Sequence, residues 1–247
     1  MTTEVTSTSR TIGINDSWLY KVAGILAFVV AILFIVDLGL YVYVGKQPTS
    51  GAAWLPYING KSGAWWAIVT VGLVCDLCLL ITNVTLYVAL RPVHKGLALI
   101  ATVWALLSIV LQETVVEPSL STMLTLGGHY ATATAAQRPA DVAAASYGAA
   151  IISSRLDTVY FTVLPAVALV LICIVMLRSP FGRRVAYLGI VAGAFGVISI
   201  SGWSLAVLLN TVLEAVWLVF VGRRLYFRYA APAPVVPAET QAEAVSI

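Results

Sequence analysis

Long apolar runs separated by short polar breaks dominate the chain. A helix needs about 20 mainly apolar residues to cross the hydrocarbon core of a bilayer. Runs of about this length occur six times, so we predict an all-α polytopic membrane bundle of six transmembrane helices. The last two runs follow each other directly and should form an antiparallel hairpin. The predicted spans are residues 18–44, 65–90, 96–116, 158–177, 185–202 and 203–221.

Polar and proline-containing breaks separate the runs. Arg91-Pro92-Val93-His94-Lys95 lies between the second and third spans. Glu117-Pro118 should end the third span, because the residue before a proline is disfavoured in helical geometry. The following segment, 119–154, is predicted to lie outside the membrane and to be largely irregular. Its alanine-rich second half, 140–153, has helical propensity, and two interpretations stay open: a helix over the outer mouth of the bundle, or a surface loop.

The two ends of the chain and its composition complete the domain organisation. Residues 1–17 are polar and lack the apolar stretch and cleavage site of a signal peptide. Residues 229–247, with Pro232, Pro234 and Pro237, are predicted to be disordered. Only 10% of the residues are charged and 60% are hydrophobic, whereas soluble domains have roughly 25% charged residues. We therefore predict one membrane domain, 18–228, in a multi-pass protein of the plasma membrane.

The distribution of basic residues predicts the orientation. Loops on the cytoplasmic side of membrane proteins carry an excess of Lys and Arg. With the N-terminus inside, ten of the fourteen basic residues fall on the cytoplasmic side, so both ends are predicted to be cytoplasmic (N-in/C-in). The net charge of +3 is too small to indicate a nucleic-acid partner. The inner set is Arg10, Lys21, Arg91, Lys95, Arg178, Arg183, Arg184, Arg223, Arg224 and Arg228; the outer set is Lys46, Lys61, Arg138 and Arg155.

Acidic residues inside the spans are the strongest functional signal. Ionisable side chains are costly in a bilayer and usually face the bundle interior or a hydrated cavity. Direction and helical rise place Asp76 near the membrane centre, with Asn83 deeper on the same face, and place Asn210 and Glu214 on one face of the last span. Six acids lie in or at the edge of the runs: Asp37, Asp76, Glu113, Glu117, Asp157 and Glu214.

This pattern predicts an acidic cavity that opens to the outside, with Asp76, Asn210 and Glu214 at its base. No basic residue lies at comparable depth, so several acids should be protonated or share protons. The expected ligand is a membrane lipid or another hydrophobic small molecule. The predicted catalytic residues are Asp76, Glu214, Glu113 and Asp37; the predicted substrate-binding residues are Asn83, Asn210, Trp217, Trp104, Gln112, Glu117 and Asp157.

Some of these residues have a structural alternative. Glu117 and Asp157 stand at the predicted membrane interface, where a solvated acid at a helix end needs no function. Asp157 could also act as the N-cap of the fourth span. The deeper acids could instead make hydrogen bonds between helices.

The cysteines and histidines indicate no cofactor. Cys75 and Cys78 form a C-x-x-C motif, but a redox pair needs an accessible thiolate, and this motif lies about ten residues deep in an apolar run. His94 and His129 are too far apart in the sequence to suggest a metal cluster. Gly189-x-x-x-Gly193 indicates close helix packing.

Two stretches of the chain resemble a bacterial six-helix membrane family of unknown function. The first is Asp76 followed by the segment 86–93, Leu-Tyr-Val-Ala-Leu-Arg-Pro-Val; the second is Arg178-Ser179 through Leu188-Gly189, then Leu213 to Leu218 and Gly222. The resemblance covers about two thirds of the chain and implies six helices, with no activity attached. In the third span the family's arginine is missing near Val103-Trp104. The family-typical positions are Asp76, Tyr87, Arg91, Glu214 and Trp217.

The architecture and the use of acids are also similar to those of small membrane-embedded terpene cyclases. That similarity implies an enzyme that protonates an isoprenoid or lipid in a cyclase- or isomerase-like reaction, with aromatic faces to stabilise the cation. Candidate wall residues are Trp65, Trp66, Trp104, Trp203 and Trp217. Two other functions stay open: a proton- or cation-coupled transporter, and a non-catalytic membrane protein.

Overall fold

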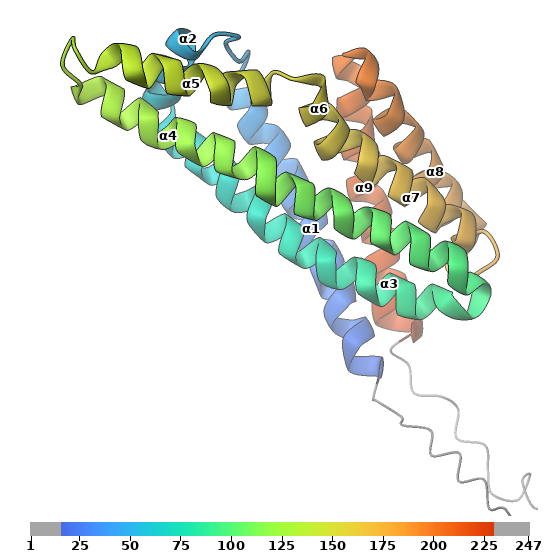
Figure 1. Cartoon of the computed structure of the whole chain (residues 1–247). Coiled ribbons are helices and arrows are strands. Elements are labelled where there is room, and N and C mark those ends of the chain that lie inside the picture. The colour runs from blue at the N-terminus through green and yellow to red at the C-terminus, as the bar shows by residue number, and fades with distance from the viewer. Residues whose placement is uncertain (1–15, 230–247) are drawn as a thin grey trace, which may run out of the picture.

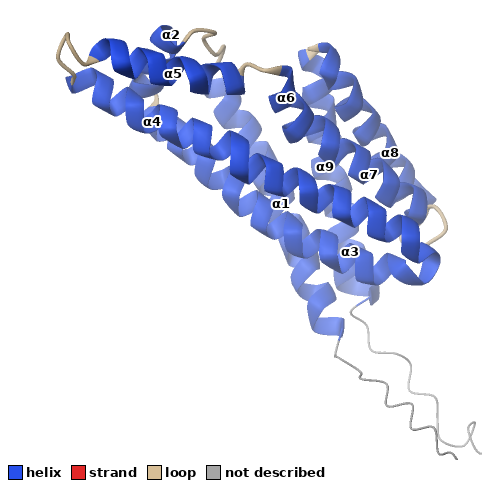
Figure 2. Ribbon diagram, in the orientation of Figure 1, coloured by secondary structure: helices blue, strands red, loops and turns tan. Residues whose placement is uncertain are grey.

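The computed structural model describes residues 16–229; the rest of the predicted tails 1–17 and 229–247 lies outside this part. Asp16 and Ser17 belong to the first helix and Tyr229 to the last helical turn. Every regular element within residues 16–229 is a helix, and no strand occurs there (Figure 2). Five helical stretches are long and apolar enough to cross a membrane, which confirms the predicted all-helical multi-pass class. They are Ser17–Val44, Ser62–Thr132, Val159–Met176, Arg183–Ser201 and Ser204–Phe227.

The second of these stretches folds back on itself. Helix α3 (Ser62–Leu111) contains Pro92, and His94 has non-helical backbone angles, with φ −156° and ψ 87°. The chain reverses at this point, so the two arms of α3 run side by side in opposite directions (Figure 1). The polar break predicted at Arg91–Lys95 is therefore a tight reversal.

The second arm of α3 does not end at Pro118. It continues through a π-helical turn, η1 (Gln112–Val116), into α4 (Glu117–Thr132). The prediction that Glu117-Pro118 stops this helix is wrong. In the π-turn the backbone N–H of Glu117 donates to the carbonyl of Gln112, and Pro118 then occupies the first turn of α4. A proline inside a helix removes one N–H from the regular hydrogen-bond ladder, and here the ladder is already interrupted by the π-turn directly before Pro118.

Three shorter helices form a separate layer at one end of the bundle, which we call the cap. It consists of α2 (Gly51–Gly60), α4 and α5 (Arg138–Ile152), and α2 was not predicted. Segment 119–154 is thus mostly helical, and its α5 lies alongside α4 (Figure 1). Trp54, Met123 and Ala145 meet in a hydrophobic core of the cap.

The remaining helices complete the main bundle and lie close to the predicted spans. Small residues allow close packing here: a Cβ atom added at Gly193 would lie 2.7 Å from the carbonyl oxygen of Ala166, as the Gly189-x-x-x-Gly193 pattern indicates. The main core joins α1, α3, α7, α8 and α9. Their bounds are α1 Asp16–Val44, α6 Arg155–Thr158, η2 Val159–Val163 (a second π-turn), α7 Leu164–Met176, α8 Arg183–Ile198, η3 Ser199–Ser201, α9 Ser204–Arg224 and η4 Leu225–Tyr229.

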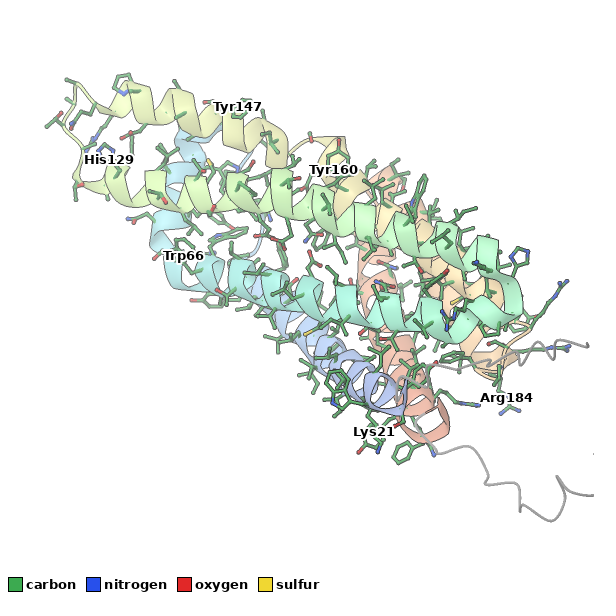
Figure 3. All side chains as sticks on the ribbon, turned by 60° about the horizontal axis from the view of Figure 1, so that its bottom comes forward. Lys21, Trp66, His129, Tyr147, Tyr160 and Arg184 are labelled. Atoms are coloured by element: carbon green, nitrogen blue, oxygen red, sulfur yellow. The ribbon has the colours of Figure 1, made fainter. Side chains whose placement is uncertain are left out.

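Charge separates the two ends of the bundle. Lys21 and Arg184 lie at one end, which we call the basic end, and His129 lies at the opposite end, in the cap (Figure 3). At the basic end, Nη1 of Arg224 donates to the carbonyl of Pro180 at 3.2 Å. At the cap end, Nζ of Lys61 donates to the carbonyl of Val44 at 2.6 Å and so satisfies the C-terminus of α1.

Candidate functional site: an acid-lined cavity

A cavity of about 720 Å³ runs between the helices of the main bundle. Its volume is typical of pockets that hold small organic ligands, roughly 300–1,000 Å³. Along the first arm of α3 it reaches from Trp65 beside the cap to Leu86 in the middle of the bundle, which is about 30 Å at the helical rise per residue. The cavity is therefore long and narrow, and most of its lining is apolar.

Five carboxyl groups from five different segments line this one cavity. They come from α1, the first arm of α3, the start of α4, α6 and α9, so residues far apart in sequence converge. The five residues are Asp37, Asp76, Glu117, Asp157 and Glu214.

The acids of the first wall interact with one another. Asp76 interacts electrostatically with Glu113 and Glu117, and Glu117 interacts with Asp37. Glu117 faces the first arm one turn from Asp76, since a Cβ atom added at Gly72 would lie 3.3 Å from its Oε1. Glu113 is not in the lining but interacts electrostatically with Asp76 and Glu117, which are. These groups form one acidic cluster of Asp37, Asp76, Glu113 and Glu117.

Each member of this cluster has a buried oxygen without a hydrogen-bond partner in the described part of the chain. The atoms are Asp37 Oδ1, Asp76 Oδ2, Glu113 Oε1 and Glu117 Oε2. Most buried polar atoms in folded proteins are hydrogen-bonded, so such exceptions need an explanation. A site that must offer a proton or an acceptor to a ligand is one.

The opposite wall carries Glu214 in a different setting. Asn210, one turn before it on α9, interacts with Glu214 and donates from Nδ2 to the carbonyl of Ala192 at 3.1 Å. Trp217 packs close to Gly189 of α8, where an added Cβ atom would lie 2.7 Å from Nε1 of the indole. Asn210, Glu214 and Trp217 all line the cavity, and Asn210 and Trp217 also contact α8.

Some of the other predicted site residues line the cavity and others do not. Asn83 and Gln112 line the cavity, and Gln112 interacts with Glu117. Trp104 does not line the cavity. Its side chain is 37% exposed on the outer face of the second arm. Its neighbours on that face, Ile100 and Leu107, are exposed too. The cavity side of this arm carries Ala105, Ser108 and Gln112.

Of the other tryptophans proposed for the wall, Trp65 and Trp217 line the cavity, whereas Trp66 and Trp203 are exposed.

Asp157 is a lining residue and not the N-cap of its helix. α6 begins at Arg155, and the N–H of Asp157 donates to Oγ of Ser154 at 3.3 Å, so Ser154 performs the capping. Burial raises the pKa of the Asp157 carboxyl to about 6, because desolvation disfavours the charged form. Asp157 and Glu117 both line the cavity, which favours a role in the site over the interpretation as solvated surface acids.

Several lining groups were missed from the sequence. Tyr41 lies one turn after Asp37 on the same face of α1, a spacing that could have revealed it. Thr162 belongs to the π-turn η2, just as Gln112 belongs to η1. Both π-turns lie against the cavity, and π-turns are frequent at functional sites. Nothing in the local sequence predicted them.

The described lining contains no Lys, Arg or His side chain. Within residues 16–229, no three His, Cys, Asp or Glu side chains are grouped so that they could hold a metal ion. Cys75 and Cys173 are buried, and all three cysteines are free thiols.

Comparisons with protein-family models, with curated proteins and with solved structures gave no match. The family resemblance noted in the sequence stays a prediction, and the site is interpreted from its own geometry.

Proposed function

We propose that this protein binds a hydrophobic isoprenoid or lipid inside the membrane and protonates it in a cyclase- or isomerase-like reaction. The observation that carries the proposal is the convergence of five carboxyl groups on one long apolar cavity whose described lining has no basic side chain. An apolar pocket with a few convergent polar groups is the usual form of a small-molecule site.

The proposal includes six membrane crossings with both ends in the cytoplasm of a plasma-membrane protein. The reversal of α3 at His94 supports this count, because it divides the second apolar stretch into two arms. The basic end supports the orientation under the positive-inside rule. The cap then lies on the outer side, and we expect water to enter at the end of the cavity beside it, which Gln47 and Trp65 line; we call this end the cap-side mouth.

Charge restricts the ligand. A phosphate or carboxylate headgroup in this cavity would meet several carboxyl groups and no described cation, and like charges in a poorly hydrated site repel strongly. The ligand should therefore be neutral or cationic, such as an alkene, an epoxide, an alcohol or an amine.

Asp76 is the proposed proton donor. Its carboxylic acid transfers a proton to one carbon of a ligand C=C bond and leaves a tertiary carbocation at the other carbon. A second C=C bond of the same chain attacks this cation and closes a ring. Loss of a proton from the adjacent carbon to a carboxylate, Glu214 or the ionised Asp76, restores a C=C bond, so the net reaction is an isomerisation that needs no oxidant. The aromatic faces of Trp65, Tyr41 and Trp217 can stabilise the cation.

Deuterium incorporation tests this function. The full-length protein in lipid nanodiscs would be incubated in D₂O with geranylgeraniol or squalene, and the products analysed by mass spectrometry. Isomeric products carrying one deuterium at carbon are expected, and Asp76→Asn should reduce their formation by about 10²-fold or more. Asp141→Asn, the same exchange in the cap, is the matched control. Unchanged product formation in both Asp76→Asn and Glu214→Gln would refute acid catalysis.

One observation favours a second function, proton-coupled transport. The π-turns η1 and η2 interrupt regular helices beside the cavity, and interrupted helices form the binding sites of many transporters. Proteoliposomes distinguish the two functions: a transporter would move protons with its ligand and leave the carbon skeleton unchanged. A purely structural polar network would instead show as loss of folding in both Asp76→Asn and Glu214→Gln.

A further inference from the structure

Helices α1 and α9 touch closely at one level and separate beyond it. A Cβ atom added at Gly24 would lie 2.9 Å from the carbonyl oxygen of Gly222, so the two backbones are in contact. Both Figure 1 and Figure 3 show the helices closest near the basic end and farther apart toward the cap. The cavity lies where they have separated, since 34–41 of α1 and 204–218 of α9 both contribute to its lining.

Leu208 marks the edge of the cavity on α9. It lines the cavity and is also 40% exposed. Ser204 and Thr211, at i−4 and i+3, line the cavity, whereas Leu205 and Val212, at i−3 and i+4, are exposed to the outside. The cavity side of α9 therefore gives way to its outer side at Leu208.

Leu38 occupies the equivalent position on α1. Phe34 and Tyr41, at i−4 and i+3, line the cavity as Leu38 itself does, and Ile35 and Val42, at i−3 and i+4, are exposed. The four exposed residues that flank the two leucines, Ile35, Val42, Leu205 and Val212, are all aliphatic. In a membrane these outer faces would meet lipid acyl chains.

Leu38 and Leu208 lie at the same level along the two helices. Leu38 follows Gly24 by 14 residues and Leu208 precedes Gly222 by 14, almost four helical turns in each case. Each leucine therefore lies on nearly the face with which its helix touches the other at the glycines, but about 21 Å farther toward the cap.

We propose that Leu38 and Leu208 form the two edges of a lateral portal through which the ligand enters from the outer leaflet of the bilayer. This inference rests on the proposed function and restricts its substrate to molecules that dissolve in the hydrocarbon of the membrane. Asp37, one residue before Leu38 and on the cavity side, is the first carboxyl group that an entering molecule meets. The glycine contact fixes the inner limit of the opening.

Site-directed labelling tests the portal without requiring turnover. A cysteine would be placed inside the cavity by Thr211→Cys, in a chain whose Cys75, Cys78 and Cys173 are replaced by alanine. The protein in nanodiscs would then react with N-dodecylmaleimide, which partitions into the bilayer, or with a charged water-soluble maleimide. The labelling rate with the lipid-soluble reagent should fall about tenfold when Leu38→Trp and Leu208→Trp narrow the opening, and Leu208→Ala should raise it.

The matched control is Ile32→Trp with Val212→Trp, which adds the same bulk at exposed positions outside the cavity lining and should leave the rate unchanged. The water-soluble reagent, entering at the cap-side mouth, should be insensitive to both pairs and so reports an intact cavity. If the lipid-soluble reagent labels equally fast with the portal narrowed, or more slowly when Leu208 is shortened, lateral entry is refuted. If lateral entry is refuted in this way but deuterium is still incorporated, only the portal is overturned and the proposed function remains supported.

Discussion

Gly222 contacts Gly24 backbone to backbone: a Cβ atom at Gly222 would lie 2.8 Å from the carbonyl oxygen of Gly24. Only a residue without a side chain fits at this crossing, because real Cβ atoms essentially never approach so closely. Ala27 and Phe28 close the contact on the α1 side. The crossing determines where α1 and α9 begin to separate, and with it where the cavity opens between them.

Gly222→Ala should therefore destabilise the bundle. The new methyl group must push α1 away from α9, and overpacking of this kind typically costs about 1–3 kcal/mol. Thermal unfolding in nanodiscs, followed by the loss of helical circular dichroism, measures the effect. Gly39→Ala is the control, since a Cβ atom there meets nothing within 4 Å and alanine is the better helix former; it should raise the melting temperature. A melting temperature of Gly222→Ala equal to or above that of the parent would contradict the contact.

Asp157 should make stability depend on pH in a defined direction. Burial raises its pKa from 3.8 to about 6 in the folded protein, so the folded state binds more protons than the unfolded state between these values. Stability must then decrease as pH rises from about 4 through 6. Asp157→Asn removes this titration, so the difference in melting temperature between variant and parent should grow in favour of the variant over that range. A constant difference from pH 4 to pH 7 would show that Asp157 is not buried.

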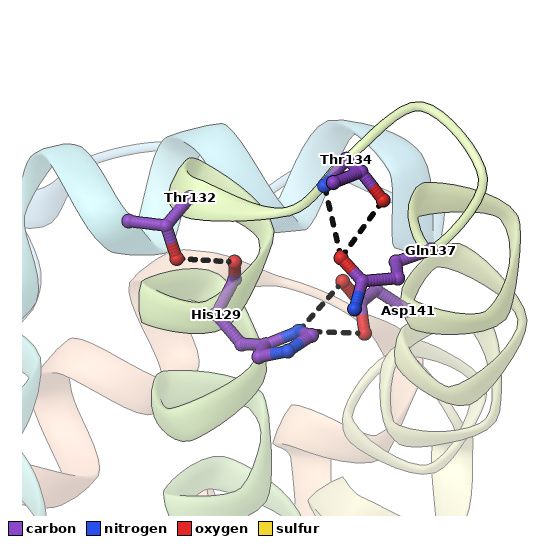
Figure 4. Close-up of polar contacts among 5 residues, drawn as sticks. All are labelled: His129, Thr132, Thr134, Gln137 and Asp141. Atoms are coloured by element: carbon purple, nitrogen blue, oxygen red, sulfur yellow. Dashed lines mark hydrogen bonds and ion pairs between the residues drawn. The ribbon is translucent and has the colours of Figure 1, made fainter.

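His129 and Asp141 join α4 to α5 in the cap (Figure 4). Nδ1 of His129 lies 2.9 Å from Oδ2 and 3.1 Å from Oδ1 of Asp141, and Asp141 is buried while His129 is half exposed. Because of that exposure, Asp141→Ala should cost only about 1 kcal/mol. Hydrogen exchange of α4 and α5 should accelerate about fivefold, with α7 to α9 unchanged. Thr125→Ala, whose hydroxyl bonds only within α4, is the control; equal protection in both variants would mean that the pair does not hold the cap.

The helices of the main bundle could be read from the sequence because hydrophobic length alone determines them. The boundaries of α1, of η2 and α7 taken together, and of α8 and α9 lie within a few residues of the predicted spans. The cap could not be read in this way. Its helices are short and partly polar, and α2 contains Pro56, so their stability comes from packing around Trp54 and Met123. The predicted helix end at Pro118 was wrong because the π-turn before this proline allows the helix to continue.

The acids of the site could be predicted because a carboxyl group in an apolar run is costly wherever it faces lipid. The order of the apolar runs determines the direction of each helix and so the depth of each acid, which is why their convergence could be predicted. The direction of the Trp104 side chain could not be predicted, because tryptophan occurs both on lipid-facing surfaces and in cavity walls. The portal at Leu38 and Leu208 depends on where α1 and α9 separate, which no periodicity of either helix reveals alone.

A density map of the full-length protein in lipid nanodiscs shows directly whether the acids share a ligand cavity. We expect the side chains of Asp76 and Glu214 to face a common cavity, and an elongated apolar molecule to lie between them when the protein is purified with native lipid or supplied with geranylgeraniol. The same map of a variant with Gly72→Trp, which fills the cavity beside Glu117, should lack that density while keeping the helices in place. Either carboxyl group pointing into the surrounding lipid, or a cavity that stays free of any such molecule under both conditions, would contradict the account.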